Sequence, residues 1–78
     1  MQQSILDRGL ELEHLELANR HMAEGQERFE RQRRLVARLQ EAGRDTKQAL
    51  ILLSELEQTL ALFTQTRDRI LGNLGMTS

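Results

Sequence analysis

A chain of 78 residues with no cysteine and no proline can form one small domain, and it has no disulfide or cysteine-based zinc site to stabilise it. Its net charge of −1 gives no overall field that would favour nucleic acid or an acidic membrane. Because it shows neither a signal-peptide pattern nor a run of eighteen apolar residues, we expect a cytoplasmic protein without a membrane span.

Residues 1–9 are weakly patterned. Ser4 and Asp7 could cap a short turn, but Gly9 argues against a continuous helix. Since chain ends are commonly disordered, we expect a frayed or loosely helical start.

Residues 10–42 are predicted to form the first helix, because apolar and small side chains recur there in steps that alternate between three and four. We call these positions the seam of the first helix: Leu15, Ala18, Met22, Gly25, Phe29, Gln32, Val36 and Leu39. An unbroken heptad pattern of this kind indicates one long helix with a narrow face toward a partner helix.

The charges of this helix change sign along its length. Residues 10–27 hold five Glu and one Arg, and residues 28–38 hold five Arg and one Glu. Acid-first pairs at spacing four should stabilise the outer face by a few tenths of a kcal/mol each. The four expected pairs are Glu16–Arg20, Glu24–Arg28, Glu27–Arg31 and Glu30–Arg34.

Residues 43–45 are predicted to be a loop, with Gly43 in the left-handed conformation just past the helix end. Asp45 can accept from the backbone of the next turn, and Gln48 would complete a pair resembling a capping box. Residues 46–72 are then the second helix, ended by Gly72 and Gly75. Its seam consists of Ala49, Leu53, Leu56, Leu60, Phe63, Arg67, Ile70 and Leu74.

Two long helices joined by so short a loop must be antiparallel. Facing seam positions should then have residue numbers that sum to 88 or 89. This register sets Gly25 opposite Phe63 and Phe29 opposite Leu60. A mid-helix glycine costs about 1 kcal/mol relative to alanine, and the Phe63 ring is a reason to keep one there.

More apolar surface is expected than one hairpin can cover, because residues 49–53 are apolar all the way round the second helix. Further surplus leucines lie off the seam: Leu12, Leu17, Leu35, Leu62 and Leu71. Monomers rarely leave such patches bare. We therefore predict a homodimer or higher homo-oligomer with Leu35, Leu50, Ile51 and Leu52 at the interface, and a different partner protein is the alternative occupant.

Gln32 is the one uncharged polar side chain in the seam. Its amide should reach water at the edge of the bundle. The alternative is a buried Gln pair across the dimer that fixes the register.

Candidate chemistry is sparse. His14 and His21 share a face beside the seam, and Glu24 follows three residues after His21, but the second helix has no histidine to complete a metal site, so we expect no metal and no cofactor. The alternative is a site in a dimer that brings His21 near its mate. No catalytic constellation can be placed, and residues 72–75 are too short for a phosphate-binding loop. The sequence thus predicts no enzyme.

One basic stretch, residues 28–38, raises the alternative of nucleic-acid binding. Glu24, Glu27 and Glu30 are expected to pair with three of its five arginines, which leaves Arg33 and Arg38 freer. No Tyr or Trp is present to stack on bases. A solvated, salt-bridged face is the favoured interpretation.

The segments His21–Gly25, Arg31–Gln32, Leu35–Val36 and Thr46–Leu60 resemble a group of short uncharacterised α-helical hairpin proteins of alphaproteobacteria. The resemblance spans about residues 12–71 and implies no activity. A superficial likeness to the small hairpin phosphatases of the sporulation phosphorelay fails, because Ser54 and Glu57 have the wrong spacing and an acid of the wrong length.

The fold predicted from the sequence is all-α: an antiparallel, coiled-coil-like two-helix hairpin over residues 1–78 that dimerises into a four-helix bundle. The predicted function is that of a small self-associating protein–protein interaction or scaffold protein. The alternative is a nucleic-acid-binding accessory protein that uses the Arg-rich half of the first helix.

Overall fold

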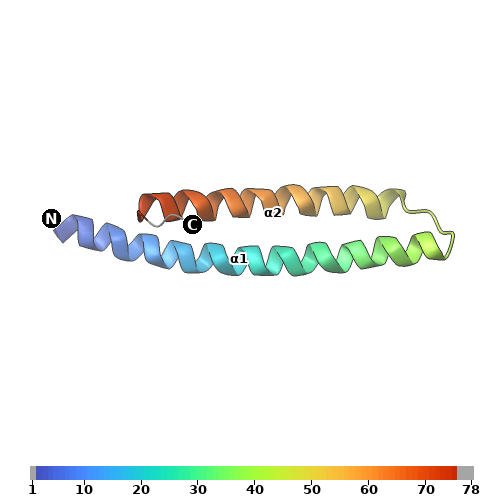
Figure 1. Cartoon of the computed structure of the whole chain (residues 1–78), viewed down its shortest axis with the longest axis horizontal. Coiled ribbons are helices and arrows are strands. Elements are labelled where there is room, and N and C mark those ends of the chain that lie inside the picture. The colour runs from blue at the N-terminus through green and yellow to red at the C-terminus, as the bar shows by residue number, and fades with distance from the viewer. Residues whose placement is uncertain (1, 76–78) are drawn as a thin grey trace.

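The computed structural model describes residues 2–75, and it describes side chains from Arg8 onward. It consists of two helices, α1 (Gln2–Glu41) and α2 (Lys47–Asn73), and the described residues contain no strand. The helices run side by side in opposite directions from a short loop (Figure 1), in a rod of 62 × 19 × 14 Å. The predicted all-α helical hairpin is confirmed.

The core is a single strip between the two helices. All sixteen seam positions are buried or half-buried, whereas most other described positions are exposed. Ala18, Ile70 and Leu74 form a buried cluster against which Leu15 packs, and Val36 is the one other buried apolar side chain among those described. The strip follows from the heptad pattern, because only positions at that spacing stay on the facing side of both helices.

Gly25 faces large side chains of α2. A Cβ built on Gly25 would lie 3.3 Å from Cδ2 of Phe63 and 3.5 Å from Cδ1 of Leu60. The glycine therefore makes room for two large side chains of α2, and its contact with Phe63 agrees with the register inferred from the loop.

Helix α1 begins earlier than the sequence predicts. It runs from Gln2 to Glu41 and includes Gly9, so residues 2–9 extend the helix that the sequence predicted from about Leu10. One glycine costs only about 1 kcal/mol in a helix and does not break it. Nη1 of Arg8 also donates to the carbonyl oxygen of Leu74 at 3.1 Å, which ties this part of α1 to the end of α2.

The loop end is built from local hydrogen bonds. Gly43 has a φ of +68°, as predicted, and its N–H donates to the carbonyl of Gln40, while the N–H of Arg44 donates to that of Leu39. These two bonds make a Schellman motif that satisfies the last carbonyls of α1. At the other end of the chain, Gly75 with φ +74° ends α2 in a similar way.

Helix α2 starts one residue later than predicted, with Thr46 as the residue before its first turn. The Asp45 carboxylate accepts from the N–H of Lys47 at 3.0 Å, which is the expected kind of contact. The capping box with Gln48 is not formed among the described residues, because the helix start has moved past the spacing that the motif requires.

Gln32 makes a contact that the sequence did not predict. Its Nε2 donates across the hairpin to the carbonyl oxygen of Ala49 at 2.9 Å in a half-buried position. That carbonyl lies in the first turn of α2, so the amide side chain ties the two helices together near the loop. One donor of this polar seam residue is thus satisfied within the hairpin.

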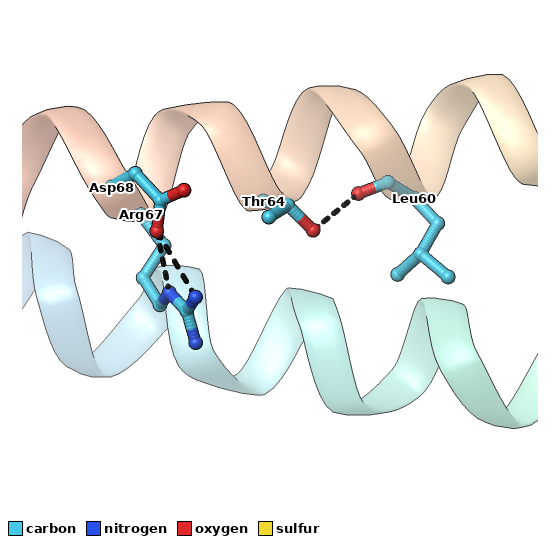
Figure 2. Close-up of polar contacts among 4 residues, drawn as sticks. All are labelled: Leu60, Thr64, Arg67 and Asp68. Atoms are coloured by element: carbon cyan, nitrogen blue, oxygen red, sulfur yellow. Dashed lines mark hydrogen bonds and ion pairs between the residues drawn. The ribbon is translucent and has the colours of Figure 1, made fainter. Parts of the chain in front are cut away.

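Arg67 is the charged residue of the seam. Its side chain extends from α2 toward α1, and its guanidinium donates twice to Asp68 Oδ1, at 3.0 and 3.3 Å (Figure 2). The aliphatic stem can thus cover the seam while the charge is paired at the edge. Nearby, the Thr64 hydroxyl donates to the carbonyl of Leu60 (Figure 2), which satisfies it within α2.

The four predicted ion pairs at spacing four are not formed within 4 Å among the described residues. Glu30 instead pairs with Arg33 at 2.9 Å, three residues on. Exposed ion pairs gain little in water, and spacings of three and four both bring side chains together on a helix, so this choice is energetically close. All the ion pairs described lie within one helix.

Candidate interaction surface

Two shallow grooves lie between the helices, one near each end of the hairpin. The loop-end groove has an apolar floor of Leu35, Leu52 and Leu56, with Gln32 beside them. Three arginines of α1 line it as well: Arg28, Arg31 and Arg38. The groove therefore combines apolar surface with positive charge.

The terminal groove is more mixed. Its α1 residues are Glu11, His14, Leu17, Ala18 and His21, and its α2 residues are Thr66, Arg69, Ile70 and Asn73. Glu11 bridges the helices here, since it accepts from Asn73 at 3.4 Å and lies 3.4 Å from the His14 ring.

Both grooves open on the same side of the hairpin. On α1 the lining residues His14, His21, Arg28 and Leu35 recur every seven residues, and that spacing keeps them on one stripe of a helix. On α2 the residues Leu52, Thr66 and Asn73 are related by multiples of seven in the same way. We call this side of the molecule the groove face.

The groove face carries most of the large apolar side chains that the hairpin leaves uncovered. Leu17, Leu35 and Leu52 line its grooves. Leu10 lies seven residues before Leu17, and Leu62 lies seven residues before the groove residue Arg69, so both share the face. All five leucines are exposed, from 36% for Leu35 to 62% for Leu62.

The four residues predicted for the dimer interface do not share one surface. Leu35, Leu50, Ile51 and Leu52 are all exposed, but the structure brings only Leu35 and Leu52 together, in the loop-end groove. Leu50 and Leu52 are separated by about 200° around α2, at ~100° per residue, and therefore face opposite sides of the hairpin. A partner that packs on one side of the hairpin covers one of these two leucines and leaves the other exposed.

Two of the surplus leucines differ from the rest. Leu71 is half-buried rather than exposed, and Leu12 lies on the side away from the grooves. The seam residues Gly25, Phe29, Leu60 and Phe63 are all buried or half-buried, so they belong to the hairpin itself and are not available to a partner.

The two histidines have separate neighbours. The His21 ring packs against Phe63 with ring centroids 5.3 Å apart, while His14 lies beside Glu11. Among the described residues, no group of three or more His, Cys, Asp or Glu side chains is arranged to hold a metal ion.

The two arginines considered for nucleic acid do not act together. Arg33 is the partner of Glu30, and Arg38 lines the loop-end groove. They are five residues apart, which places them about 140° apart around the helix. The arginines that share a surface are Arg28, Arg31 and Arg38. Their spacing of three and seven in the sequence is the signal that would have identified them.

Leu10 is the exposed apolar residue that the sequence reasoning missed, because it lies at the predicted start of the first helix. Its spacing of seven from Leu17 would have placed it on the groove face. Neither helix, over the residues described, has a stretch of sufficient length and apolar character to cross a bilayer.

No protein-family model, curated protein or solved structure matches the chain. The likeness to bacterial helical-hairpin proteins stays a prediction.

Proposed function

We propose that this protein is a small self-associating interaction or scaffold protein, in which two hairpins pair through their groove faces to form a four-helix bundle. The observation that carries the proposal is the set of five exposed leucines on one face of a two-helix rod: Leu10, Leu17, Leu35, Leu52 and Leu62. The proposal assigns the protein no catalytic role.

The small core supports this proposal. Among the described residues only four apolar side chains are buried, and none is completely buried. Chains of this size bury a smaller share of their surface than larger domains and are marginally stable alone. A second layer of helices would cover the exposed leucines and supply the burial that one seam lacks.

A second copy of the chain is the occupant that fits best. The same patch on two copies can be joined by a two-fold axis, which is the commonest symmetry of homo-oligomers. The charges also suit self-pairing, because α1 is mostly acidic over residues 10–27 and mostly basic over residues 28–38. The acidic part of α1 in one copy would therefore attract the basic part of α1 in the other copy.

Sedimentation equilibrium of the purified chain tests the proposal directly. We expect a mass twice that of one chain, falling toward one on dilution. A well-folded species that stays monomeric at high protein concentration contradicts the proposal.

A matched pair of variants then tests the face. Leu52→Glu places a charge in the loop-end groove and should convert the dimer to monomer. Leu50→Glu is the control, because it changes the same residue type on the same helix at nearly equal exposure, 43% against 44%, but faces the other side. Equal effects of the two substitutions would show that the groove face is not the interface.

A second candidate function, nucleic-acid binding, is supported by Arg28, Arg31 and Arg38 along one groove. Phosphate contacts from such a row give affinity that falls steeply with salt. The test is a titration of labelled RNA or DNA at low and moderate salt, with Arg31→Gln compared with Arg33→Gln on another face. No binding at low salt excludes this function.

A further inference from the structure

We infer that the two hairpins pair antiparallel, with their loops at opposite ends and a two-fold axis that crosses α2 at Leu62. This inference rests on the proposed self-association and specifies its geometry. The partner is a second copy of this chain, and the contact is the groove face.

The first support is the position of the exposed leucines along the rod. Leu17 and Leu35 are about 27 Å apart along α1 at ~1.5 Å per residue, with their midpoint at residue 26. Phe63 contacts the site of a Gly25 Cβ at 3.3 Å, so its neighbour Leu62 lies at the level of that midpoint. In an antiparallel pair with a two-fold axis at this level, Leu17 lies against the Leu35 groove of the other copy. Leu62 lies against Leu62 of the partner subunit.

The second support is the charge pattern of α2 on either side of Leu62. Glu55 lies seven residues before Leu62, and Arg69 lies seven residues after it. A spacing of seven keeps all three on one stripe of the helix, and Arg69 lines the terminal groove of the groove face. A two-fold axis through Leu62 therefore sets Glu55 opposite Arg69 of the partner subunit, and it does so twice.

Helix α1 has the same kind of complementarity. Arg28, Arg31 and Arg38 lie on the groove face toward the loop, and Glu24, seven residues after Leu17, lies on the same face on the other side of residue 26. An antiparallel arrangement about residue 26 sets Arg28 opposite Glu24 of the partner subunit. A parallel two-fold arrangement would instead stack α1 on α2 of the other copy, so Leu17 would not meet the Leu35 groove.

Cross-linking tests the position of the axis, because the chain has no cysteine of its own. We expect Leu62→Cys to be joined efficiently into a covalent dimer by a short bismaleimide. Leu50→Cys, on the opposite side of α2, should be joined much less. Leu62 is 62% exposed, so the substitution leaves the seam unchanged.

A charge-reversal cycle tests the pairing independently. Either single change, Glu55→Arg or Arg69→Glu, should weaken dimerisation about tenfold, since it turns two attractive pairs into repulsive ones. The double variant Glu55→Arg with Arg69→Glu should restore the affinity of the unmodified chain.

The outcomes separate this inference from the proposed function. A dimer in sedimentation that is cross-linked no better at Leu62 than at Leu50, or whose double variant is as weak as the singles, overturns the antiparallel geometry and leaves self-association standing. A chain that is monomeric at every concentration overturns both.

Discussion

The loop end and the open end of the hairpin are held by different kinds of contact. At the loop end, Gly43, Asp45 and Arg44 make hydrogen bonds to residues no more than five positions away, and Gln32 adds one bond across to Ala49. At the open end, the contacts join residues that are distant in the sequence. Arg8 donates to Leu74, and Asn73 donates to Glu11.

Burial follows the same division. Three of the four buried apolar side chains, Ala18, Ile70 and Leu74, cluster near the open end, while Val36 is buried alone toward the loop. The loop end is closed by the chain itself, which lowers the entropy cost of bringing the helices together there. The open end has no such connection, and packing between distant residues must keep it closed.

The largest expected effect is from removing the open-end core. Ile70→Ala should destabilise the protein by about 2–5 kcal/mol, because it leaves a cavity beside Ala18 and Leu74. Val36→Ala removes less volume and should cost less. Denaturant unfolding at fixed protein concentration measures both, and hydrogen exchange should show lost protection at the open end for Ile70→Ala. If Ile70→Ala reduces hydrogen-exchange protection equally at both ends, the open end does not depend on this core more than the loop end does.

The next effect concerns the middle of the rod. Gly25→Leu should destabilise the hairpin by about 1–3 kcal/mol, because the new side chain would collide with Phe63 and Leu60. Gly72→Leu is the control, since a Cβ there meets no atom within 4 Å. An unchanged melting temperature for Gly25→Leu would argue against the close approach of the helices at this level.

A smaller effect is expected at the loop. Gly43→Ala forces an alanine into a left-handed conformation with φ +68° and should cost about 1–2 kcal/mol. Gly9→Ala, in open space on α1, should instead stabilise the protein by about 1 kcal/mol. Thermal melts of the two variants should therefore move in opposite directions, and parallel shifts would be inconsistent with this account.

The smallest effect should come from the contact between the chain ends. Arg8→Gln removes a positive charge that hydrogen bonds the end of α2, which is worth about 0.3–1 kcal/mol. Arg20→Gln serves as the control, because Arg20 makes no ion pair within 4 Å among the described residues. Hydrogen exchange of the last turn of α2 should increase for Arg8→Gln only.

The sequence pattern predicted the hairpin because it is repetitive and long. Eight seam positions on each helix give the same answer, so a local exception such as Gln32 or Arg67 does not change it. Gly43 was predictable for a related reason, since a left-handed residue after a helix favours glycine strongly.

Single side chains at the surface were less predictable. The partner of Glu30 changed from Arg34 to Arg33, and Asp45 bonded Lys47 without the help of Gln48. Such choices depend on small energy differences between neighbouring positions, which a sequence pattern does not resolve. The contact of Arg8 with Leu74 joins residues 66 positions apart, which a local sequence pattern does not reveal.

The sequence by itself determined that two helices form, that they face each other along one stripe, and that the chain turns at Gly43. These properties follow from heptad spacing and local backbone preference, which act within a few residues. Only the tertiary structure decided which exposed leucines share a face and which charges are level with one another. Those depend on how the two helices are placed side by side, and it is this placement that brings Leu35 of α1 and Leu52 of α2 into one groove.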